Sequence, residues 1–527
     1  MKKISLKYGW VGLLVGLFFA CSYEDKSIYV EELLPEIFID TTGVSDGAME
    51  LRVSRDALLS IHPKIVFEGA TDEDFEYEWR LGLNMEGGSA AGMGDYIVLS
   101  TQKDLDWVVD IFGTPQYKFF PLWYRVKHKK TGMIATIKWL LTVHSEVPSG
   151  MVVIDTEDEQ TSDFTVVRDR CFMNTMADKP TTYNRNIYSR THGGQKFDGV
   201  VKNIFHQKLY KGAELVDYMH GFTDNNRIFR MDTYNFDVIA EGKELFYDPD
   251  IVLNIDNYVE LGTWHDVSAF CIIDGKLYKR LNERNGDIVI SKFGLPLTMD
   301  EGCRIPSQLA GAERLVFLSE EDGRFYRVNI NDYVDYNAPK PYADSVAIGA
   351  AFDPNNLKGY KTVAAETFGV HDFRFVLEKE GKYYFCTLNR DNPGEWYDLS
   401  NAPDIEHAVA FAIGKQANYI WYATPDKVYT INRNIAGKLS YNEFYDPEDP
   451  IEKLWLHKGS LDASNQMTTR ECGLLITTWN GTEGKLHWTT TGNGTNATGY
   501  ILYDWEKLPG VVVFDGFKRI VAVANIW

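Results

Sequence analysis

A strand–turn–strand pattern recurs through the last two thirds of this chain. Each copy has an apolar strand, a turn with Gly or Asp, and then a basic residue and an aromatic residue. The clear copies are 269–278 (AFCIIDGKLY), 315–326 (LVFLSEEDGRFY), 375–384 (FVLEKEGKYY), 419–429 (YIWYATPDKVY) and 474–488 (LLITTWNGTEGKLHW), and a weaker one is 242–247 (GKELFY). Each copy predicts a β-hairpin, because its turn needs a positive φ that glycine supplies without strain.

The spacing of the copies indicates how the hairpins are assembled. The clear copies begin 44 to 60 residues apart, which is around the period expected of the four-stranded blades of a β-propeller. A ring of blades leaves only short, protected sheet edges. Residues 146–527 are long enough for seven or eight blades of roughly 45–55 residues each. We expect seven, with 511–514 and 520–524 completing the last blade. The alternative is a stack of unrelated hairpins in a sandwich.

Residues 35–145 predict a separate, smaller β domain. Polar and apolar residues alternate in 76–81 (EYEWRL) and 122–127 (LWYRVK), and 134–143 (IATIKWLLTV) follows a turn at 130–132 (KTG). Period-two alternation broken by Gly, Asp and Pro indicates a β-sandwich, and about 110 residues is the size of one immunoglobulin-like domain. The expected fold class is therefore all-β. Helical periodicity is weak, with a turn or two expected at 104–109 and 213–219.

The first 21 residues predict an exported, lipid-anchored chain. Lys2, Lys3 and Lys7 precede an apolar run at 11–20 (VGLLVGLFFA). That run is too short for a spanning helix of roughly 20 apolar residues and is typical of a signal peptide. Cys21 follows at once, and 18–21 (FFAC) resembles a bacterial lipobox. We expect residues 1–20 to be the signal, Cys21 the lipid attachment site and 21–34 a tether. The alternative is an ordinary secretory signal with an accidental Cys21.

Short motifs along the chain resemble one family. The segments 77–79 (YEW), 123–126 (WYRV) and 141–143 (LTV) look like a PKD-type domain. The stretch from 23–26 (YEDK) to 37–40 (IFID) looks like the N-terminus of the PKD-like lipoproteins of Bacteroidota. The resemblance implies a PKD-like domain followed by a larger β domain. It brings no catalytic motif and no cofactor.

The same resemblance implies a location and a role. The acidic pair Glu24-Asp25 is similar to the signal that sends lipoproteins of such bacteria to the exterior face of the outer membrane. In that setting the chain would be an accessory lipoprotein of a SusC/SusD-like nutrient uptake system. Its work would be to bind or present a peptide or a glycan beside the transporter.

Composition narrows the classes of partner. The formal net charge is −21, and an acidic surface repels phosphate backbones, so nucleic acid is excluded as a partner. Six cysteines occur, and five remain when Cys21 is set aside. Their odd number and the absence of CxxC spacing argue against a disulfide framework. Buried free thiols are the expectation.

Motifs for catalysis or metal binding are missing from the sequence. There is no HExxH and no GxSxG, so no metal ligand, cofactor or catalytic residue is predicted. Asp266, Asp372 and Asp404 lie near expected blade starts but receive no role. A propeller hydrolase or lyase acting on polysaccharide, with acids converging in the central channel, is the alternative function. A structural partner that docks the transporter through an apolar patch is a third possibility.

Aromatic residues beside Gly, Pro or Asn are the candidate ligand contacts. Propellers bind ligands through loops on a rigid scaffold, and sugar rings and peptide side chains stack on aromatic faces. The candidates are Trp264, Tyr360, Trp396 and Trp479. The alternative for each is an ordinary place in the core.

Overall fold

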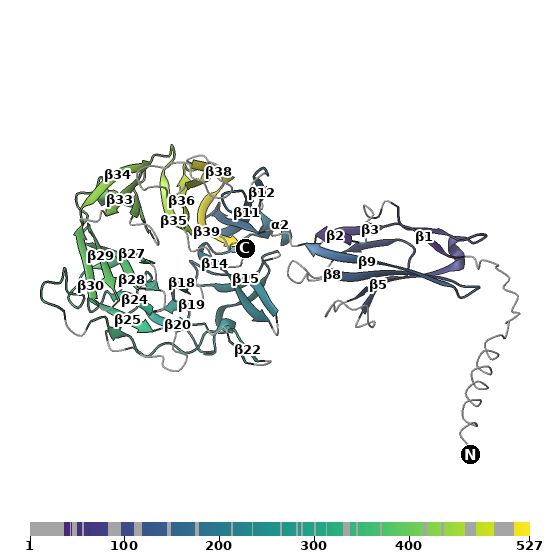
Figure 1. Ribbon diagram of the computed structural model, residues 1–527, viewed down its shortest axis with the longest axis horizontal. Helices are drawn as coiled ribbons and strands as arrows, with labels where there is room; N and C mark the ends of the chain where they lie inside the picture. Colours follow the sequence, from purple (N-terminus) through teal and green to yellow (C-terminus); the bar gives the residue numbers. More distant parts are fainter. Residues whose placement is uncertain are drawn as a thin grey trace, which may run out of the picture. The chain divides into compact units, whose positions relative to one another are not determined.

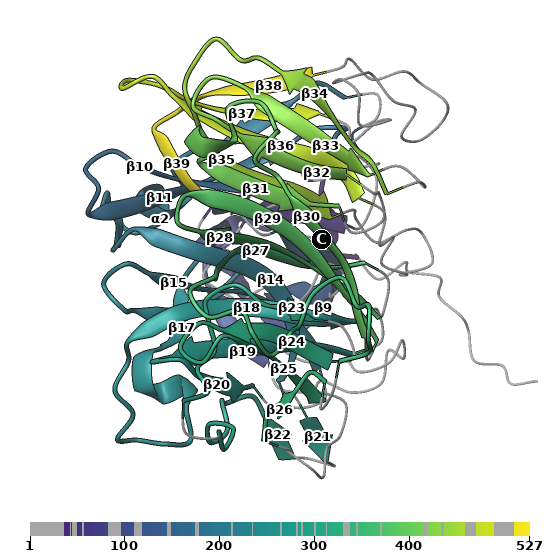
Figure 2. The ribbon, with the colours of Figure 1, turned by 90° about the vertical axis from the view of Figure 1, so that its left-hand side faces the viewer.

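The chain folds into two compact units, Met1–His144 and Ser145–Trp527. The computed structural model describes residues 36–526 with gaps, the longest being 83–95, 110–118, 330–337, 459–470 and 490–510. Nearly all regular structure in the described residues is β-strand (Figures 1 and 2). No helix of the described part is long and apolar enough to cross a membrane. The signal segment, Cys21 and the tether lie outside the described residues.

The first unit is built around a five-stranded sheet in the order β2-β9-β8-β5-β6, in which only β2 and β9 run parallel. Two short antiparallel pairs, β1-β4 and β3-β7, accompany it. The strands are β1 (Phe38–Asp40), β2 (Glu50–Ser54), β3 (Leu58–Ile61), β4 (Lys64–Val66), β5 (Phe75–Gly82), β6 (Tyr96–Ser100), β7 (Leu105–Val108), β8 (Phe119–His128) and β9 (Ile134–His144). The three strands predicted from alternation lie within β5, β8 and β9.

Stacked aromatic rings form the centre of the first unit. Trp79, Tyr124 and Trp139 are fully buried. The Trp79 ring lies 4.2 Å from that of Tyr124 and 5.8 Å from that of Trp139. The indole N–H of Trp79 donates to the carbonyls of Gln102 and Lys103 at 3.2 and 3.3 Å. This ring therefore joins the sheet to the chain that leads into β7.

We predict that Trp79→Ala destabilises the first unit by about 3–5 kcal/mol, because it removes the largest buried side chain and leaves a cavity. Hydrogen exchange of peptides from β5, β8 and β9 in increasing urea measures the change. The matched control is Trp123→Ala on β8, since Trp123 is only half-buried. Equal effects of the two substitutions would contradict this account of the core.

In its described residues the second unit contains seven sheets of three or more strands, in chain order around a ring (Figure 1), and one separate two-stranded sheet. Figure 2 shows the same unit from the side. The first sheet is β12 (Thr182–Asn184), β11 (Thr161–Arg168), β10 (Gly150–Thr156) and β39 (Arg519–Ile526), with β13 (Phe197–Asp198) on β11. The second is β14 (Val201–Lys211), β15 (Glu214–Thr223), β16 (Ile228–Asp232) and β17 (Val238–Glu241). The third is β18 (Ile255–Thr263), β19 (Asp266–Ile273) and β20 (Lys276–Lys279), followed by the hairpin of β21 (Glu283–Asn285) and β22 (Ile288–Ile290).

The remaining four sheets each have four antiparallel strands in sequence order. The fourth is β23 (Ala310–Gly311), β24 (Arg314–Ser319), β25 (Arg324–Asn329) and β26 (Lys340–Pro341). The fifth is β27 (Lys361–Phe368), β28 (Asp372–Lys379), β29 (Lys382–Asn389) and β30 (Asn392–Asp398). The sixth is β31 (Ala410–Ile413), β32 (Tyr419–Ala423), β33 (Val428–Arg433) and β34 (Leu439–Tyr445). The seventh is β35 (Ile451–Lys458), β36 (Glu471–Trp479), β37 (Gly484–Thr489) and β38 (Val511–Phe517).

Each sheet of the ring packs both of its faces against neighbouring sheets. Seven apolar clusters lie between successive sheets, and each takes residues from two of them. Val152 and Phe229 belong to the cluster between the first and second sheets, and Val153 and Trp488 to the one between the first and seventh. The series of clusters therefore closes on itself. The prediction of an all-β chain with a sandwich and a seven-bladed propeller is confirmed.

The recurring sequence motif is the hairpin between the second and third strands of a blade. In β19–β20 the turn residues Asp274 and Gly275 have φ of 51° and 70°, which suits the tight hairpin turns that need positive φ. The five clear copies all occupy this place. The weaker copy was wrong, because its first residues form a 3₁₀ turn at Gly242–Leu245. The hairpin of that blade is β15–β16, where Asn226, with φ of 62°, occupies the positive-φ turn position that glycine is expected to fill.

The C-terminal strands are divided between two blades. Residues 511–514 lie in β38 and do complete the seventh sheet. Residues 520–524 lie in β39, which pairs instead with β10 of the first sheet, with Val523 opposite Val153. The expectation that both runs end in the last blade was therefore wrong for the second run. The reason is that β38 already occupies the outer edge of the seventh sheet, whereas β10 has a free inner edge.

The two expected helical turns were also wrong. Residues 104–109 contribute β7, and residues 213–219 contribute to β15. The one described α-helix is the short α2 (Ile187–Thr191).

We predict that Ala522→Asp in β39 destabilises the second unit by on the order of 3–5 kcal/mol, because it places an unpaired charge in the core between the first and second sheets. Ala522 is 3% exposed, whereas Val513 on β38 is 45% exposed. Val513→Asp is therefore the matched control and should change stability little. Thermal unfolding followed by circular dichroism measures both. A stable Ala522→Asp variant would show that the ring does not depend on β39.

Candidate functional site

A pocket of about 520 Å³ opens at one mouth of the ring, where the innermost strands begin. Its walls come from the first residues of β14, β35 and β39, the residue before β31, the end of β10 and two connecting loops. The lining residues are Thr156, Glu159, Val200, Lys202, Asp224, Val409, Ile451, Glu452, Lys453, Arg519, Ile520 and Val521. Residues far apart in sequence are thus held at one place by rigid strands.

A repeated β-bulge shapes this mouth. The pairing register shifts by one residue near the start of five inner strands and leaves Lys202, Asp256, Val363, Glu452 and Val521 without a paired neighbour. Bulges re-aim a side chain and are common next to functional sites. The bulge residues of β14, β35 and β39 all line the pocket.

Arg519 is the best-satisfied charge in the pocket. Its Nε and Nη2 donate to the carboxylate of Glu452 at 2.9 and 2.8 Å, and its Nη1 donates to Glu159 at 2.5 Å. The hydrogen bond with Glu452 is the largest cause of the raised pKa of Arg519. Because Arg519 begins β39 while Glu159 follows β10, this contact also joins the two strands that close the ring.

Lys453 presents a buried ammonium group to the same pocket. Its Nζ donates to the carbonyl of Val521 at 2.5 Å and lies 5.6 Å from the centre of the Trp455 ring. Burial, and after it the positive charge of Lys202, lowers the pKa of Lys453 to about 8. A lysine with such a pKa is still mostly charged at pH 7.

A pair of buried carboxyl groups lies beside the pocket rather than in it. Asp155 and Asp163 are opposite each other on β10 and β11 and are 8% and 5% exposed. Asp155 accepts a hydrogen bond from the Lys518 amide at 2.7 Å, and Asp163 accepts one from the Ser189 hydroxyl at 2.5 Å. Burial raises the pKa of Asp155 to about 6, with a smaller contribution from the charge of Asp163.

We predict that Asp155→Asn stabilises the chain above pH 6 by up to about 3 kcal/mol and not below pH 4. The folded-state pKa of about 6 exceeds the ordinary value of 3.8. The stability linked to the protonated form is therefore complete below pH 3.8 and is lost as pH rises through 6. An asparagine oxygen still accepts from the Lys518 amide.

Urea unfolding midpoints of the wild type and of Asp155→Asn between pH 4 and pH 8 test whether the variant is the more stable protein at high pH. The control is Asp426→Asn in the exposed turn between β32 and β33, which should give a flat difference across the range. A variant at position 155 that is less stable at pH 8 would refute the account.

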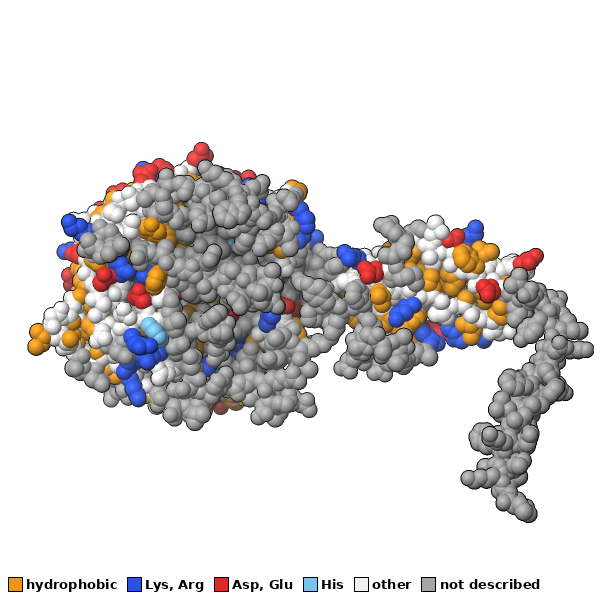
Figure 3. Space-filling model, in the orientation of Figure 1, with side chains coloured by type: hydrophobic (Ala, Val, Ile, Leu, Met, Phe, Trp, Pro, Cys, Tyr) orange, Lys and Arg blue, Asp and Glu red, His pale blue; other side chains and the backbone are white. Residues whose placement is uncertain are grey.

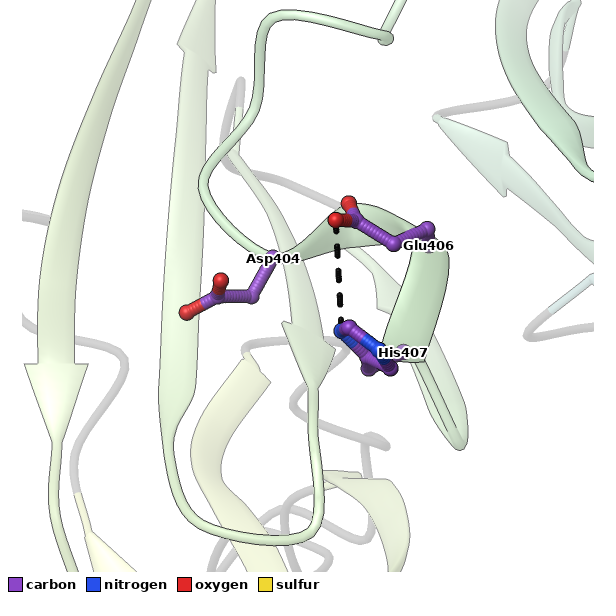
Figure 4. Close-up of side chains that lie close together, drawn as sticks. All are labelled: Asp404, Glu406 and His407. Carbon is purple, nitrogen blue, oxygen red and sulfur yellow. Dashed lines mark ion pairs between the residues drawn. The ribbon is translucent and has the colours of Figure 1, made fainter.

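Three possible metal ligands gather at the exposed turn Ile405–His407 (Figure 4). Ligand atoms of Asp404, Glu406 and His407 lie within 4.8 Å of one another. The Glu406 and His407 side chains face each other across 4.0 Å and are 63% and 69% exposed. Water competes strongly for ligands this exposed, so the cluster gives no support to a metal site.

The three described aromatic residues of the four singled out in the sequence do not line the pocket. Tyr360 and Trp396 are brought together, with ring centres 5.5 Å apart, in a half-buried cluster beside the fifth sheet. Trp479 lies half-buried at the end of β36. Trp264 lies outside the described residues. Whether any of these rings contacts a ligand stays a prediction.

Asp372 and Asp404, two of the acids near the expected blade starts, are also separate from the pocket. Asp372 is bound to Arg374 at 3.2 Å, and Asp404 belongs to the exposed cluster. The side chain of Asp266 is not described. Cys171, Cys271 and Cys386 are buried free thiols, as expected.

Sequence reasoning missed every charged residue of the pocket. The available signal was a charge in the second or third place of an apolar strand, as in 201–205 (VKNIF) and 451–455 (IEKLW). Side chains along an ordinary strand alternate between the two faces of the sheet, so a charged residue at such a place is expected to point to solvent. Only the bulge, which depends on pairing, places it at the mouth of the ring.

Comparison with known proteins supports the PKD-like resemblance over part of the chain. Residues 22–199 match the sequence model of the PKD-like family, a span that covers the first unit and extends into the first blade. No curated protein matches the chain.

Several solved structures are similar at low identity. A quinoprotein alcohol dehydrogenase-like protein from Bacteroides thetaiotaomicron is 10% identical, with a TM-score of 0.42 over 94% of this chain and 98% of that one. The β-propeller domain of Cps50 (Swd1) from Myceliophteria thermophila is 9% identical, with a TM-score of 0.34 over 60% and 90%. The WD40 domain of Toxoplasma gondii coronin is 10% identical, with a TM-score of 0.34 over 64% and 79%. Scores this low carry no argument about function.

Proposed function

We propose that this chain is a binding protein that holds a small polar ligand in the mouth pocket of its propeller. The pocket is the observation that carries the proposal. Its volume of about 520 Å³ lies within the 300–1,000 Å³ common for small-molecule sites. Its polar groups come from strand starts and are fixed by Arg519 and its two carboxylate partners. Fixed polar groups around a preformed hollow favour binding without a large ordering cost.

The proposal extends to where the protein works. A lipid on Cys21 would hold the chain on the exterior face of the outer membrane, as the signal-like segment 1–20 indicates. Tethering raises the effective concentration of a bound nutrient near a SusC/SusD-like transporter. The cargo would be a peptide or a glycan.

The first unit carries apolar surface suited to a protein partner of this kind. The cross-strand pairs Phe38–Val66 and Leu58–Val108 are about half exposed or more at all four side chains. Apolar side chains are visible on the described surface of this unit, among acidic and basic ones (Figure 3). Exposed apolar groups of this sort commonly mark interaction surfaces.

We predict that Val409→Trp abolishes ligand binding without unfolding the propeller. Val409 lines the pocket and is 48% exposed, so an indole there fills the hollow. Val513→Trp is the control, because Val513 is 45% exposed on β38 and outside the pocket. Calorimetric titration against peptide and glycan pools measures binding. Equal binding by both variants would place the ligand elsewhere.

Purification of the full-length protein from its membrane in mild detergent tests the location and the partner. Recovery with a transporter barrel and its lid lipoprotein supports the uptake role, and a Cys21→Ser variant should then leave the membrane fraction. Recovery alone contradicts the uptake role. Turnover of a bound polysaccharide would instead favour a hydrolase or lyase.

A further inference from the structure

The pocket contains two ammonium groups that form no ion pair with a carboxylate of the described chain. Lys202 on the bulge of β14 and Lys453 on β35 both line it. Among the described residues, neither has a carboxylate oxygen within 4.0 Å, and the bond recorded for Lys453 goes to the Val521 carbonyl. In a chain of net charge −21, two cations that share one pocket and form no ion pair can donate to an anionic ligand group.

The acids of the pocket are already committed to other groups. Glu452 and Glu159 both accept from Arg519. Asp224 accepts the amide of Val200 at 3.0 Å. Glu452 and Glu159 are therefore held by Arg519, and Asp224 is held by a backbone amide. Neither lysine forms an ion pair with these acids.

Burial and mutual repulsion make the lysine pair receptive to an anion. Lys453 is the more enclosed of the two, whereas Lys202 is exposed. Burial is the main cause that lowers the pKa of Lys453, and the charge of Lys202 is the next. A negative group placed between them removes the repulsion and forms charge-assisted hydrogen bonds.

We propose, on the basis of the binding function above, that the pocket recognises a ligand carboxylate between Lys453 and Lys202. A singly charged group fits better than a phosphate dianion, because three cationic and three acidic side chains line the pocket and the acids repel added negative charge. The carboxylate would come from a uronic acid of a glycan or from the C-terminus of a peptide. The ligand is therefore acidic even though the protein is acidic.

Matched acid and neutral probes test the proposal on the full-length protein in mild detergent. One pair is a glucuronate-ended disaccharide and its glucose-ended analogue, and the other is a free dipeptide and its C-terminal amide. We expect the acid member of one pair to bind at least tenfold more tightly than its neutral partner. The pair that shows this preference identifies the source of the carboxylate.

Lysine variants and pH identify the groups responsible. Lys453→Met and Lys202→Met should each remove the preference for the acid, while Lys453→Arg should retain it. Lys208→Met is the control, because Lys208 is 47% exposed near Asp217 and outside the pocket. The affinity of the wild type for the acid should fall above pH 8, because Lys453 then loses its proton. The other charged groups that line the pocket around it are Lys202, Arg519, Glu159, Glu452 and Asp224. That fall should be absent in Lys453→Met.

Two outcomes would overturn the carboxylate proposal. One is that acids and neutral partners bind equally, and the other is that no acid probe binds. In either case, neutral ligands that bind and are blocked by Val409→Trp would leave the binding function intact. Failure of every ligand to respond to Val409→Trp would reject the binding function as well.

Discussion

The antiparallel pairing of β39 with β10 is the constraint on which the second unit depends. It places a strand from the end of the unit on the inner edge of its first sheet. Without it, the clusters on both sides of the first sheet would lose Ile520, Ala522 and Ile526. In a ring each sheet is buried by its neighbours, so an opening at one place exposes two apolar faces at once. Closure is therefore a cooperative requirement rather than one contact among many.

The pocket proposed as a binding site results from the same closure. Arg519, the first residue of β39, is bound to Glu452 at the start of β35 and to Glu159 after β10. The bulges that follow in β14, β35 and β39 turn their extra side chains toward the mouth. A fixed ion-pair network around Arg519 thus forms part of the pocket wall, and Lys202 and Lys453, which form no ion pair with a described carboxylate, line the same pocket. Charges that hold the fold and charges proposed to bind a ligand lie within a few residues of each other.

Features that depend on nearby residues could be predicted from the sequence, and features that depend on pairing could not. The hairpin at Asp274-Gly275 is encoded by its own turn, and the buried ring of Trp79 by alternation along one strand. The place of β39 depends on a vacancy at β10, which lies more than 350 residues earlier in the chain. The bulge at Lys202 depends in turn on how β14 meets β15. For that reason the sequence predicted the fold class but not the pocket, and it pointed to aromatic residues such as Trp396 as ligand contacts.

The contact between Glu159 and Arg519 spans 360 residues, and this separation sets when the pocket can exist. A chain still being synthesised has the first wall of the pocket but not the second. Long-range closure of this kind is slow compared with local hairpin formation. An unfinished chain therefore cannot hold a ligand in this pocket. The site comes into being only once the ring is complete.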